Sequence, residues 1–317
     1  MMKAPNLNKS HKNKFGNVIY NNILSYENED IINYENGKLE NKYLVPPFSI
    51  LDSRKGYWKE RKEIWNHLIH QYDDNRKFNE LIFDGDDEYK RNDLNFDPVL
   101  VELIYLWFGK EENTRILDPF CGEHNNGIIA GELGLKYYGV DIRADQIELN
   151  KKFTHEYSDV NYFHGDSNYL ENILSSHKFN LCISSPPYYD LEVYDFDYLN
   201  SLGGYDEFLD GYRNIFQQVY NLLEDNSFLV LKLGEIRDSF GVNRGFLADN
   251  IKIMQSIGFA YYNEIILILS DNTAFKRANN YMKNRKVVKV HQNILVFYKG
   301  DVGNIQDNFN LFDGDYL

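Results

Sequence analysis

Four short groups of residues carry the side chains best suited to chemistry in this chain. They are Asp-Pro-Phe-Cys-Gly at 118–122, an acid at Asp141, Gly-Asp at 165–166 and Ser-Pro-Pro-Tyr at 185–188. A glycine-bearing turn lets a ligand approach backbone amides, and carboxylates can accept hydrogen bonds from ribose hydroxyls or an adenine amino group. Taken singly, these groups also fit ordinary turns and helix caps. In this order they predict a site for a nucleoside-containing cofactor.

Each group follows or ends a short apolar run that we interpret as a strand. The predicted strands cover 114–118, 137–141, 161–164, 179–184, 228–233, 264–269 and 293–298. Helical patterns are expected over 99–108, 127–133, 144–152, 205–223 and 246–256. This alternation predicts an α/β fold, a Rossmann-like doubly wound sheet that is mostly parallel, with ligands at the carboxyl ends of its strands. The last strand is expected to be antiparallel, because no convincing crossover helix precedes it.

These motifs resemble those of the S-adenosylmethionine-dependent DNA amino-methyltransferases, which modify cytosine N4 or adenine N6. Residues 118–122 resemble the cofactor loop of that family, and residues 185–188 resemble its catalytic tetrapeptide. The segment 47–52, with Gly56-Tyr57-Trp58 and Arg61-Lys62, is similar to the segment before the core of phage-type DNA methylases, as is the run 184–194. The resemblance covers residues 45–300.

The resemblance implies S-adenosylmethionine as the cofactor and assigns the residues that bind it. These are Asp118, Pro119, Phe120, Cys121, Gly122, Asp141, Ile142, Asp166 and Ser167, together with Phe48 and Asp52 at the adenine or methionine end. Glu123-His124 departs from the family, which has small residues there. Their side chains are expected either to change cofactor binding or to turn to solvent or cap the next helix.

The tetrapeptide suits methylation of an exocyclic amino group. Such a nitrogen is a poor nucleophile, because its lone pair is delocalised into the base. The Ser185 hydroxyl and the Pro186 carbonyl can accept hydrogen bonds from the amino group and so localise that lone pair. Pro187 stiffens the loop, and Tyr188 can stack on an extruded base. Methylation of cytosine C5 would need a cysteine after a proline in this loop, whereas Cys182 lies within the preceding strand.

The resemblance favours cytosine N4 as the methylated atom, because Ser in the first position is more typical of those enzymes. Adenine N6 is the alternative, although enzymes that methylate adenine N6 usually have Asp or Asn at that first position. The same architecture serves methylation of RNA bases and of protein glutamine. A homologue that binds cofactor or DNA without catalysis is also left open, given Glu123-His124. A restriction–modification role follows from the resemblance alone.

Charge is distributed unevenly along the chain. It holds 34 Lys and Arg against 48 Asp and Glu, and the net charge of −14 by itself disfavours a polyanionic partner. Residues 1–18 and 272–300 contain eleven basic residues and no acid. The first stretch, with Lys3, Lys9, Lys12 and Lys14, is a candidate arm around a duplex. The second is predicted to contact the phosphates of double-stranded DNA through Lys276, Arg277, Lys283, Arg285, Lys286 and Lys289.

Composition divides the chain into four predicted parts. These are an N-terminal arm at 1–43, partly disordered, a segment at 44–97 that contributes to the cofactor site and DNA contacts, a methyltransferase core at 98–300 with a basic insert at 272–292, and an acidic tail at 301–317. Trp58 and Trp65 are expected on the buried face of a helix over 56–70. Specificity for the target DNA sequence is expected to come from the basic insert, the loop 190–204 or the first 100 residues.

The two cysteines, Cys121 and Cys182, are expected in the core, and they fit a reducing cytoplasm and no metal site. No apolar run is long enough for a bilayer, and no secretory signal is evident, so a cytoplasmic location without a membrane partner is expected. The oligomeric state is left unknown.

Overall fold

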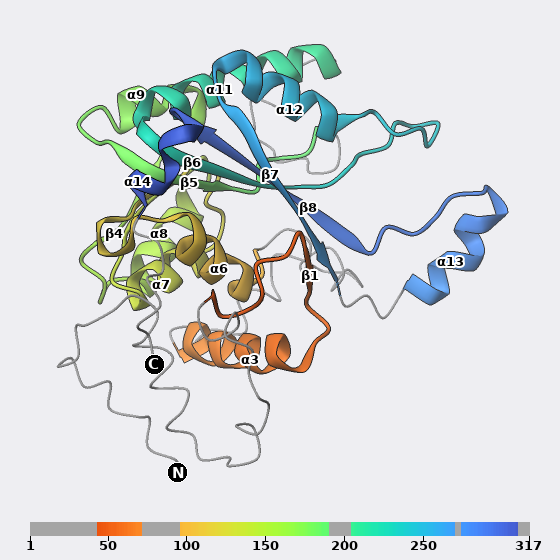
Figure 1. Cartoon of the computed structure of the whole chain (residues 1–317), viewed down its shortest axis with the longest axis horizontal. Coiled ribbons are helices and arrows are strands. Elements are labelled where there is room, and N and C mark those ends of the chain that lie inside the picture. The colour runs from red at the N-terminus through yellow and green to blue at the C-terminus, as the bar shows by residue number, and fades with distance from the viewer. Residues whose placement is uncertain (1–42, 72–95, 190–203, 270–273, 310–317) are drawn as a thin grey trace, which may run out of the picture.

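One mixed sheet of eight strands organises the residues that the computed structural model describes, which are 43–71, 96–189, 204–269 and 274–309 (Figure 1). The strand order is β1-β7-β8-β6-β5-β2-β3-β4. β8 runs antiparallel to its neighbours β6 and β7, and the other neighbouring pairs are parallel. The predicted Rossmann-like fold with an antiparallel last strand is therefore confirmed.

The bounds of the elements agree closely with most of the predicted runs. The strands are β1 Ile50–Asp52, β2 Arg115–Asp118, β3 Lys136–Asp141, β4 Val160–His164, β5 Phe179–Ser184, β6 Leu223–Leu233, β7 Ala260–Ile268 and β8 His291–Lys299. The helices are α3 Gly56–Gln71, α6 Pro98–Phe108, α7 Asn125–Glu132, α8 Ala144–Phe153, α9 Leu170–Ile173, α11 Tyr205–Leu222, α12 Phe246–Ile257, α13 Ala274–Lys283 and α14 Ile305–Asn308. Short 3-10 turns occupy Glu111–Asn113, Ser167–Tyr169 and Val302–Asn304.

Two apolar layers cover the two faces of the sheet. One contains buried residues of α3, α6, α7 and α8, and the other contains those of α9, α11 and α12, which Figure 1 shows on opposite sides of the strands. Along β6, Phe228 and Val230 belong to the first layer, whereas Leu229 and Leu231 belong to the second. This alternation is the two-residue period of a strand buried on both faces.

The segment before the core is attached to α6 through two tryptophans. Trp58 and Trp65 on α3 are fully buried, as predicted from their spacing. Their indole N–H groups donate to Asp97 Oδ1 at 3.1 Å and to Glu102 Oε2 at 2.8 Å. Because Arg61 pairs with the same Glu102 carboxylate, this buried charge is both hydrogen-bonded and neutralised.

Two elements differ from the sequence-based expectation. Residues 50–52 form the edge strand β1, which pairs in parallel with β7 from Ile50↔Ile266 to Asp52↔Ile268. A helix, α13, lies between β7 and β8, although it is not a crossover helix, because the two strands remain an antiparallel pair up to Ile268↔His291. α13 has no buried residue and extends away from the sheet (Figure 1), so no core-facing pattern marked it in the sequence.

The beginning of the predicted tail is packed on the core. The Phe309 ring, after α14, lies 5.1 Å from the Phe228 ring, and the Lys110 ammonium lies 5.4 Å from the Phe309 ring centre. The N-terminal lysines, the loop 190–203 and the end of the tail lie outside the described residues. Within the described ranges, no helix has both the length and the apolar character needed to cross a bilayer.

Candidate active site

The four predicted groups meet at one edge of the sheet. β2 lies between β5 and β3, and β4 follows β3, so the loops after these strands leave the sheet side by side. The register places Asp118 beside Gly139 and Asp141 beside His164. In an open α/β sheet this carboxyl edge is where ligands bind.

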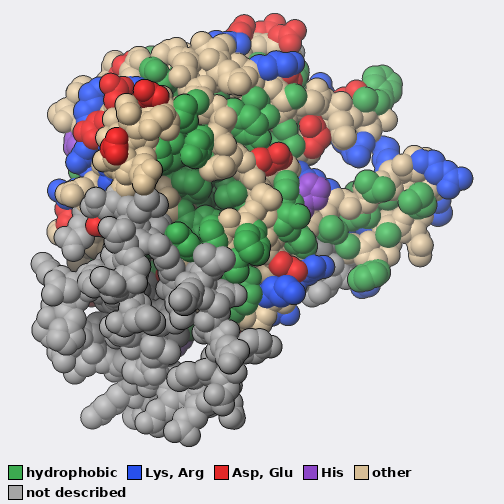
Figure 2. Space-filling view, in the orientation of Figure 1, with side chains coloured by type: hydrophobic (Ala, Val, Ile, Leu, Met, Phe, Trp, Pro, Cys, Tyr) green, Lys and Arg blue, Asp and Glu red, His purple; other side chains and the backbone are tan. Residues whose placement is uncertain are grey.

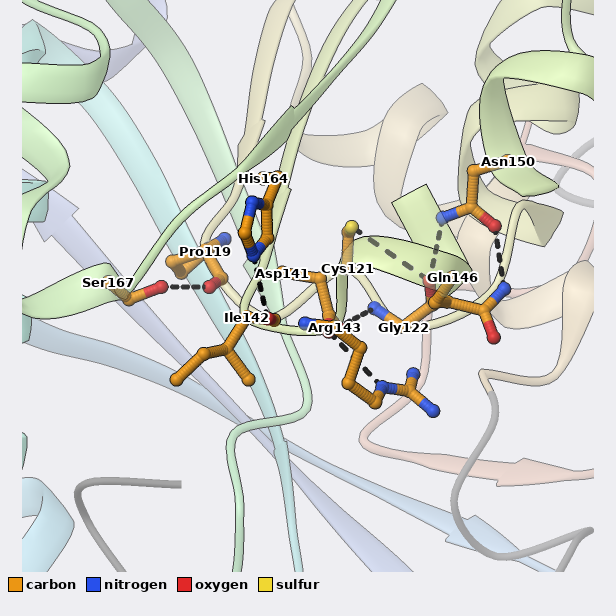
Figure 3. A network of polar contacts seen from close by, with 10 residues as sticks. All are labelled: Pro119, Cys121, Gly122, Asp141, Ile142, Arg143, Gln146, Asn150, His164 and Ser167. Atoms are coloured by element: carbon orange, nitrogen blue, oxygen red, sulfur yellow. Dashed lines mark hydrogen bonds and ion pairs between the residues drawn. The ribbon is translucent and has the colours of Figure 1, made fainter. Parts of the chain in front are cut away.

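The loop after β2 is held in place at Gly122 (Figure 3). The Gly122 amide donates to Asp141 Oδ2 at 2.9 Å, and its carbonyl accepts from Asn150 Nδ2 at 2.7 Å. Its φ of 53° is left-handed, and a Cβ added there would meet no atom within 4 Å. The loop is therefore fixed by side chains behind it and leaves open space in front, which fits a ligand lying against its backbone.

Asp141 connects this loop to the end of β3. Besides the Gly122 amide, its carboxylate accepts from the Arg143 backbone N–H at 2.9 Å and from Arg143 Nε at 3.2 Å, both on Oδ1. A carboxylate has about four acceptor positions, so Oδ2 retains one for a further donor. A ribose hydroxyl at the end of β3 would suit that position.

Asp118 faces the core rather than the open side of the loop. Its carboxylate is fully buried and accepts from Asn126 Nδ2 and Tyr137 Oη, each at 2.9 Å on Oδ2. Burial raises the pKa of Asp118 to about 6, against the effect of these two hydrogen bonds. The Asp118 side chain thus holds the loop from the core side.

The remaining predicted cofactor residues line the same loops. Cys121 is buried, and its amide donates to the Val140 carbonyl at 3.0 Å. The Pro119 carbonyl accepts from the Ser167 hydroxyl, and the Ile142 carbonyl lies 3.1 Å from His164 Nε2 (Figure 3). Asp166 accepts from the Asn168 amide at 2.8 Å. These contacts tie the ends of β2, β3 and β4 to one another.

Two further residues of the loop pack inward. The half-buried Phe120 ring lies 6.4 Å from the Phe216 ring of α11. Cys121 and Cys182 are both buried, as expected, and burial raises the pKa of both thiols.

The side chain of His124 does not turn to solvent. It is buried, its ring lies 4.6 Å from the Phe153 ring of α8, and its side chain makes no capping hydrogen bond to α7, although its backbone is at the N-cap. The bulky residue is thus accommodated behind the loop, between α7 and α8. Its carbonyl accepts from Tyr162 Oη at 3.3 Å.

The tetrapeptide after β5 adjoins the end of β6 and the basic insert. Pro186 and Pro187 are buried, whereas Ser185 and Tyr188 are partly exposed. A Cβ added at Gly234, just after β6, would lie 3.6 Å from Tyr188 Cε1 and 3.4 Å from Lys289 Nζ. Lys289 Nζ and the Tyr188 ring therefore both lie against Gly234, and Lys289 Nζ also donates to Asn293 Oδ1 at 3.3 Å.

The other predicted DNA-contacting residues lie farther out. Figure 2 shows Lys and Arg side chains gathered on the projection that carries α13 in Figure 1. Of the residues in this projection, Lys276, Lys283 and Arg285 are exposed, and Arg277 and Lys286 are partly exposed. The structure thus separates Lys289, which is close to Tyr188, from the rest of the insert.

Phe48 and Asp52 are not placed at this site, which corrects the prediction for both. They lie in or before β1, and β7, β8 and β6 separate β1 from β5. At about 4.8 Å per strand, that is about 19 Å from the tetrapeptide strand. Asp52 instead pairs with Arg54 at 2.8 Å, and this hydrogen bond lowers the pKa of Asp52 to about 2.

Sequence reasoning missed several residues that build the site. Asn150 on α8 holds the Gly122 carbonyl, and Gln146 donates to Asn150 Oδ1 at 2.8 Å. The Arg244 guanidinium lies over the rings of Tyr189 and Tyr205, 5.0 and 5.2 Å from their centres. No motif marks Asn150 or Arg244, because each acts through a partner distant in the sequence. Among the described residues, no cluster of three or more His, Cys, Asp or Glu could hold a metal ion.

Comparison with known proteins gives a consistent picture for the second half of the core. Residues 179–313 match the family model described as a DNA methylase, N6_N4_Mtase. The match begins at β5 and includes the tetrapeptide, Gly234 and the basic insert. It supports an amino-methyltransferase of the N4/N6 class. S-adenosylmethionine is the methyl donor of that family, in agreement with the predicted cofactor.

Individual relatives are distant. The tRNA (guanine(10)-N2)-dimethyltransferase of Pyrococcus abyssi is 38% identical over 77 residues, so the match spans 23% of this chain and 23% of that protein. TrmN from Thermus thermophilus is 14% identical with a TM-score of 0.44, over 64% of this chain and about half, 49%, of that one. Magnesium protoporphyrin IX methyltransferase from Synechocystis PCC 6803, solved with bound SAM, is also 14% identical with a TM-score of 0.44. That match covers 74% of this chain and 97% of the methyltransferase.

Proposed function

We propose that this protein methylates the exocyclic amino group of a base in double-stranded DNA, with S-adenosylmethionine as the methyl donor. Cytosine N4 is the first choice for the acceptor atom, and adenine N6 is the alternative. The observation that carries this proposal is the position of the Ser-Pro-Pro-Tyr loop. It leaves the end of β5, beside the glycine loop at the end of β2, within a segment that matches a DNA methylase model.

The glycine loop and Asp141 fit the cofactor. Gly122 presents open backbone, and Asp141 Oδ2 keeps an acceptor position for a ribose hydroxyl. Asp118, Asn126 and Tyr137 fix the loop from the core side. Binding of the cofactor would therefore cost little entropy for ordering the loop. When bound, S-adenosylmethionine supplies an electrophilic methyl group at the edge shared by β2 and β5.

The tetrapeptide would prepare the amino nitrogen for attack. The Ser185 oxygen and the Pro186 carbonyl would accept hydrogen bonds from its two N–H groups and localise its lone pair toward the methyl carbon. The bound cofactor would supply the methyl group and be released as its thioether, and the proton lost by the nitrogen would pass by way of the Ser185 hydroxyl to solvent. Tyr188 holds the base by stacking, so orientation supplies much of the rate.

The position of the basic insert supports DNA as the substrate. β7 ends and β8 begins at the same edge as β5 ends, because β8 is antiparallel to both of its neighbours. The insert between them holds no acid from 272 to 290, and Lys289 comes close to Tyr188. Phosphates beside an extruded nucleotide would therefore meet positive charge next to the tetrapeptide.

Mass spectrometry of nucleosides tests this function. Plasmid DNA is incubated with the full chain and S-adenosylmethionine, digested and compared with DNA incubated without cofactor, and bulk tRNA is treated in parallel. N4-methyldeoxycytidine supports the first choice, and N6-methyldeoxyadenosine alone selects the alternative. Methylated tRNA with unmodified DNA rejects a DNA substrate. Binding of S-adenosylmethionine by calorimetry without transfer to either identifies a non-catalytic homologue.

A further inference from the structure

The connection between β6 and α12 is an ordered hairpin, which we call the β6–α12 hairpin (residues 234–245). Arg237 and Asn243 form an antiparallel bridge across it. The Asp238 amide donates to the Val242 carbonyl at 2.9 Å, and the Asp238 carboxylate accepts from the amides of Phe240 and Val242 at 3.0 and 2.8 Å. Its tip is therefore fixed by its own hydrogen bonds.

This rigid tip presents apolar side chains to solvent. Phe240 is 88% exposed and Val242 is 62% exposed. Gly241 between them has a φ of 81°, which allows the tight turn. The two apolar side chains contribute little to packing within the protein, and the rigid tip leaves them accessible to a partner.

The base of the hairpin is anchored at the candidate active site. Glu235 Oε1 accepts from the amides of Ile236, Gly245 and Phe246 at 3.1, 3.0 and 2.9 Å. The Phe246 ring lies 5.9 Å from the Tyr188 ring, and Arg244 covers Tyr189. The hairpin thus extends from the tetrapeptide itself, and its tip keeps a fixed relation to an extruded base.

Two cations lie at Gly241, next to Phe240 in the apolar tip. Arg237 Nη1 donates to the Gly241 carbonyl at 2.8 Å. Lys286 of the basic insert also lies against Gly241, since a Cβ added at Gly241 would be 1.8 Å from Lys286 Nζ. Figure 1 shows the hairpin and the α13 projection leaving the sheet on the same side. An apolar tip with two cations beside it matches a DNA duplex, in which stacked bases lie next to phosphates.

We propose that Phe240 is a wedge that enters the base stack of duplex DNA and occupies the space left by the extruded target nucleotide. This assignment rests on the proposed function, because methylation of the amino group is the reason why a base leaves the duplex. The ring restores the stacking that the two neighbouring base pairs lose, and Arg237 and Lys286 hold the flanking phosphates. Filling the gap stabilises the extruded state relative to the closed duplex.

Binding to a duplex that already contains a gap tests the wedge without relying on catalysis. Fluorescence anisotropy of the full chain is measured with a labelled duplex carrying one tetrahydrofuran abasic site and with the same duplex intact. We expect the wild type to prefer the abasic duplex by about tenfold, and Phe240→Ala to lose that preference. Phe275→Ala is the matched control, because Phe275 is an equally exposed phenylalanine, 87% against 88%, on α13. Phe240→Trp should keep the preference.

Methyl transfer to plasmid DNA provides the second measurement. Phe240→Ala should lower transfer to native plasmid by about tenfold and leave transfer to the same plasmid, heat-denatured, within about twofold, because a single strand has no gap to fill. The wedge is overturned if the wild type shows no abasic preference, if Phe240→Ala retains it, or if transfer falls equally on both DNA forms. An abasic preference without transfer to any DNA leaves the wedge standing and rejects the proposed methylation.

Discussion

Ser184 and Ser185 are neighbours in the chain with different surroundings. Ser184 ends the buried strand β5, is fully buried, and its hydroxyl has no hydrogen-bond partner among the described residues. Ser185 begins the loop and is partly exposed toward the ligand edge. The pair therefore separates the effect of a missing hydroxyl on the sheet from its effect on substrate.

Ser185→Ala should reduce methyl transfer while leaving cofactor binding intact. Loss of one acceptor for the amino protons is expected to lower kcat by about 100-fold or more, with the dissociation constant for S-adenosylmethionine changed less than about twofold. Label transfer to plasmid DNA and calorimetry measure the two quantities. Ser184→Ala, the control, should retain wild-type transfer. Normal turnover in Ser185→Ala would exclude the role of its hydroxyl.

Asp118 predicts a pH dependence of stability, because burial raises the pKa of its carboxyl from 3.8 to about 6. The folded state then binds more protons than the unfolded state between these two values, so stability contributed by this group falls as pH rises from 4 to 6 and is constant above. The loss approaches about 3 kcal/mol.

Asp118→Asn provides the comparison, since Asn keeps an oxygen acceptor and does not ionise. The free energy of unfolding of the wild type minus that of the variant, measured by urea denaturation at pH 4, 5, 6 and 7, should decrease across the range found for Asp118. A difference that does not change with pH would show that Asp118 titrates as an ordinary carboxyl.

At the scale of elements, runs that are buried on both faces were readable from the sequence. β5 begins and ends where its apolar run does, because all six residues are buried. β1 was missed because its three residues become a strand only by pairing with β7, more than 200 positions later in the chain. α13 was missed because it buries nothing. The local sequence shows neither the pairing of β1 with β7 nor the lack of burial along α13.

The site shows the same limit. The order of motifs predicted which loops converge, since parallel strands end at one edge. It did not predict that the Asp118 side chain turns inward. The local sequence of an acid at a strand end is the same whether its hydrogen-bond donors are Asn126 and Tyr137 or a ligand. The misplaced Phe48 and Asp52 reflect the sheet order, which puts a segment preceding the core at the far edge.

The basic insert contains two kinds of lysine, and kinetics should separate them. Lys289→Ala removes charge beside Tyr188 and should lower kcat by about tenfold, whereas Lys283→Ala, on exposed α13, should raise KM for DNA with little change in kcat. Lys289→Arg should restore part of the activity. Equal effects of both alanine variants on KM alone would place Lys289 with the outer phosphate contacts.

At the scale of the whole molecule, the net charge of −14 conceals a separation of sign. The basic residues of the insert gather on one projection (Figure 2), while acids dominate the rest of the chain. Such a protein can bind a polyanion along one side and repel it elsewhere. The average charge is therefore a poor guide to its partners.

The salt dependence of DNA binding measures this separation. The double variant Lys283→Ala/Arg285→Ala should reduce the slope of log affinity against log salt concentration by about 2, since each phosphate contact contributes about 0.9. Lys136→Ala/Lys151→Ala removes the same charge at the start of β3 and on α8 and should leave the slope nearly unchanged. Equal slopes for the two double variants would mean that DNA does not approach along the insert.

The position of β8 has a consequence for synthesis of the protein. Of the strands that the structure describes, β8 comes last in the sequence, yet it lies between β6 and β7. Until residues 291–299 leave the ribosome, β7 and β1 have no strand through which to join the rest of the sheet, and Lys289 is not held beside Tyr188. A nascent chain can therefore fold the glycine loop before it completes the tetrapeptide's surroundings.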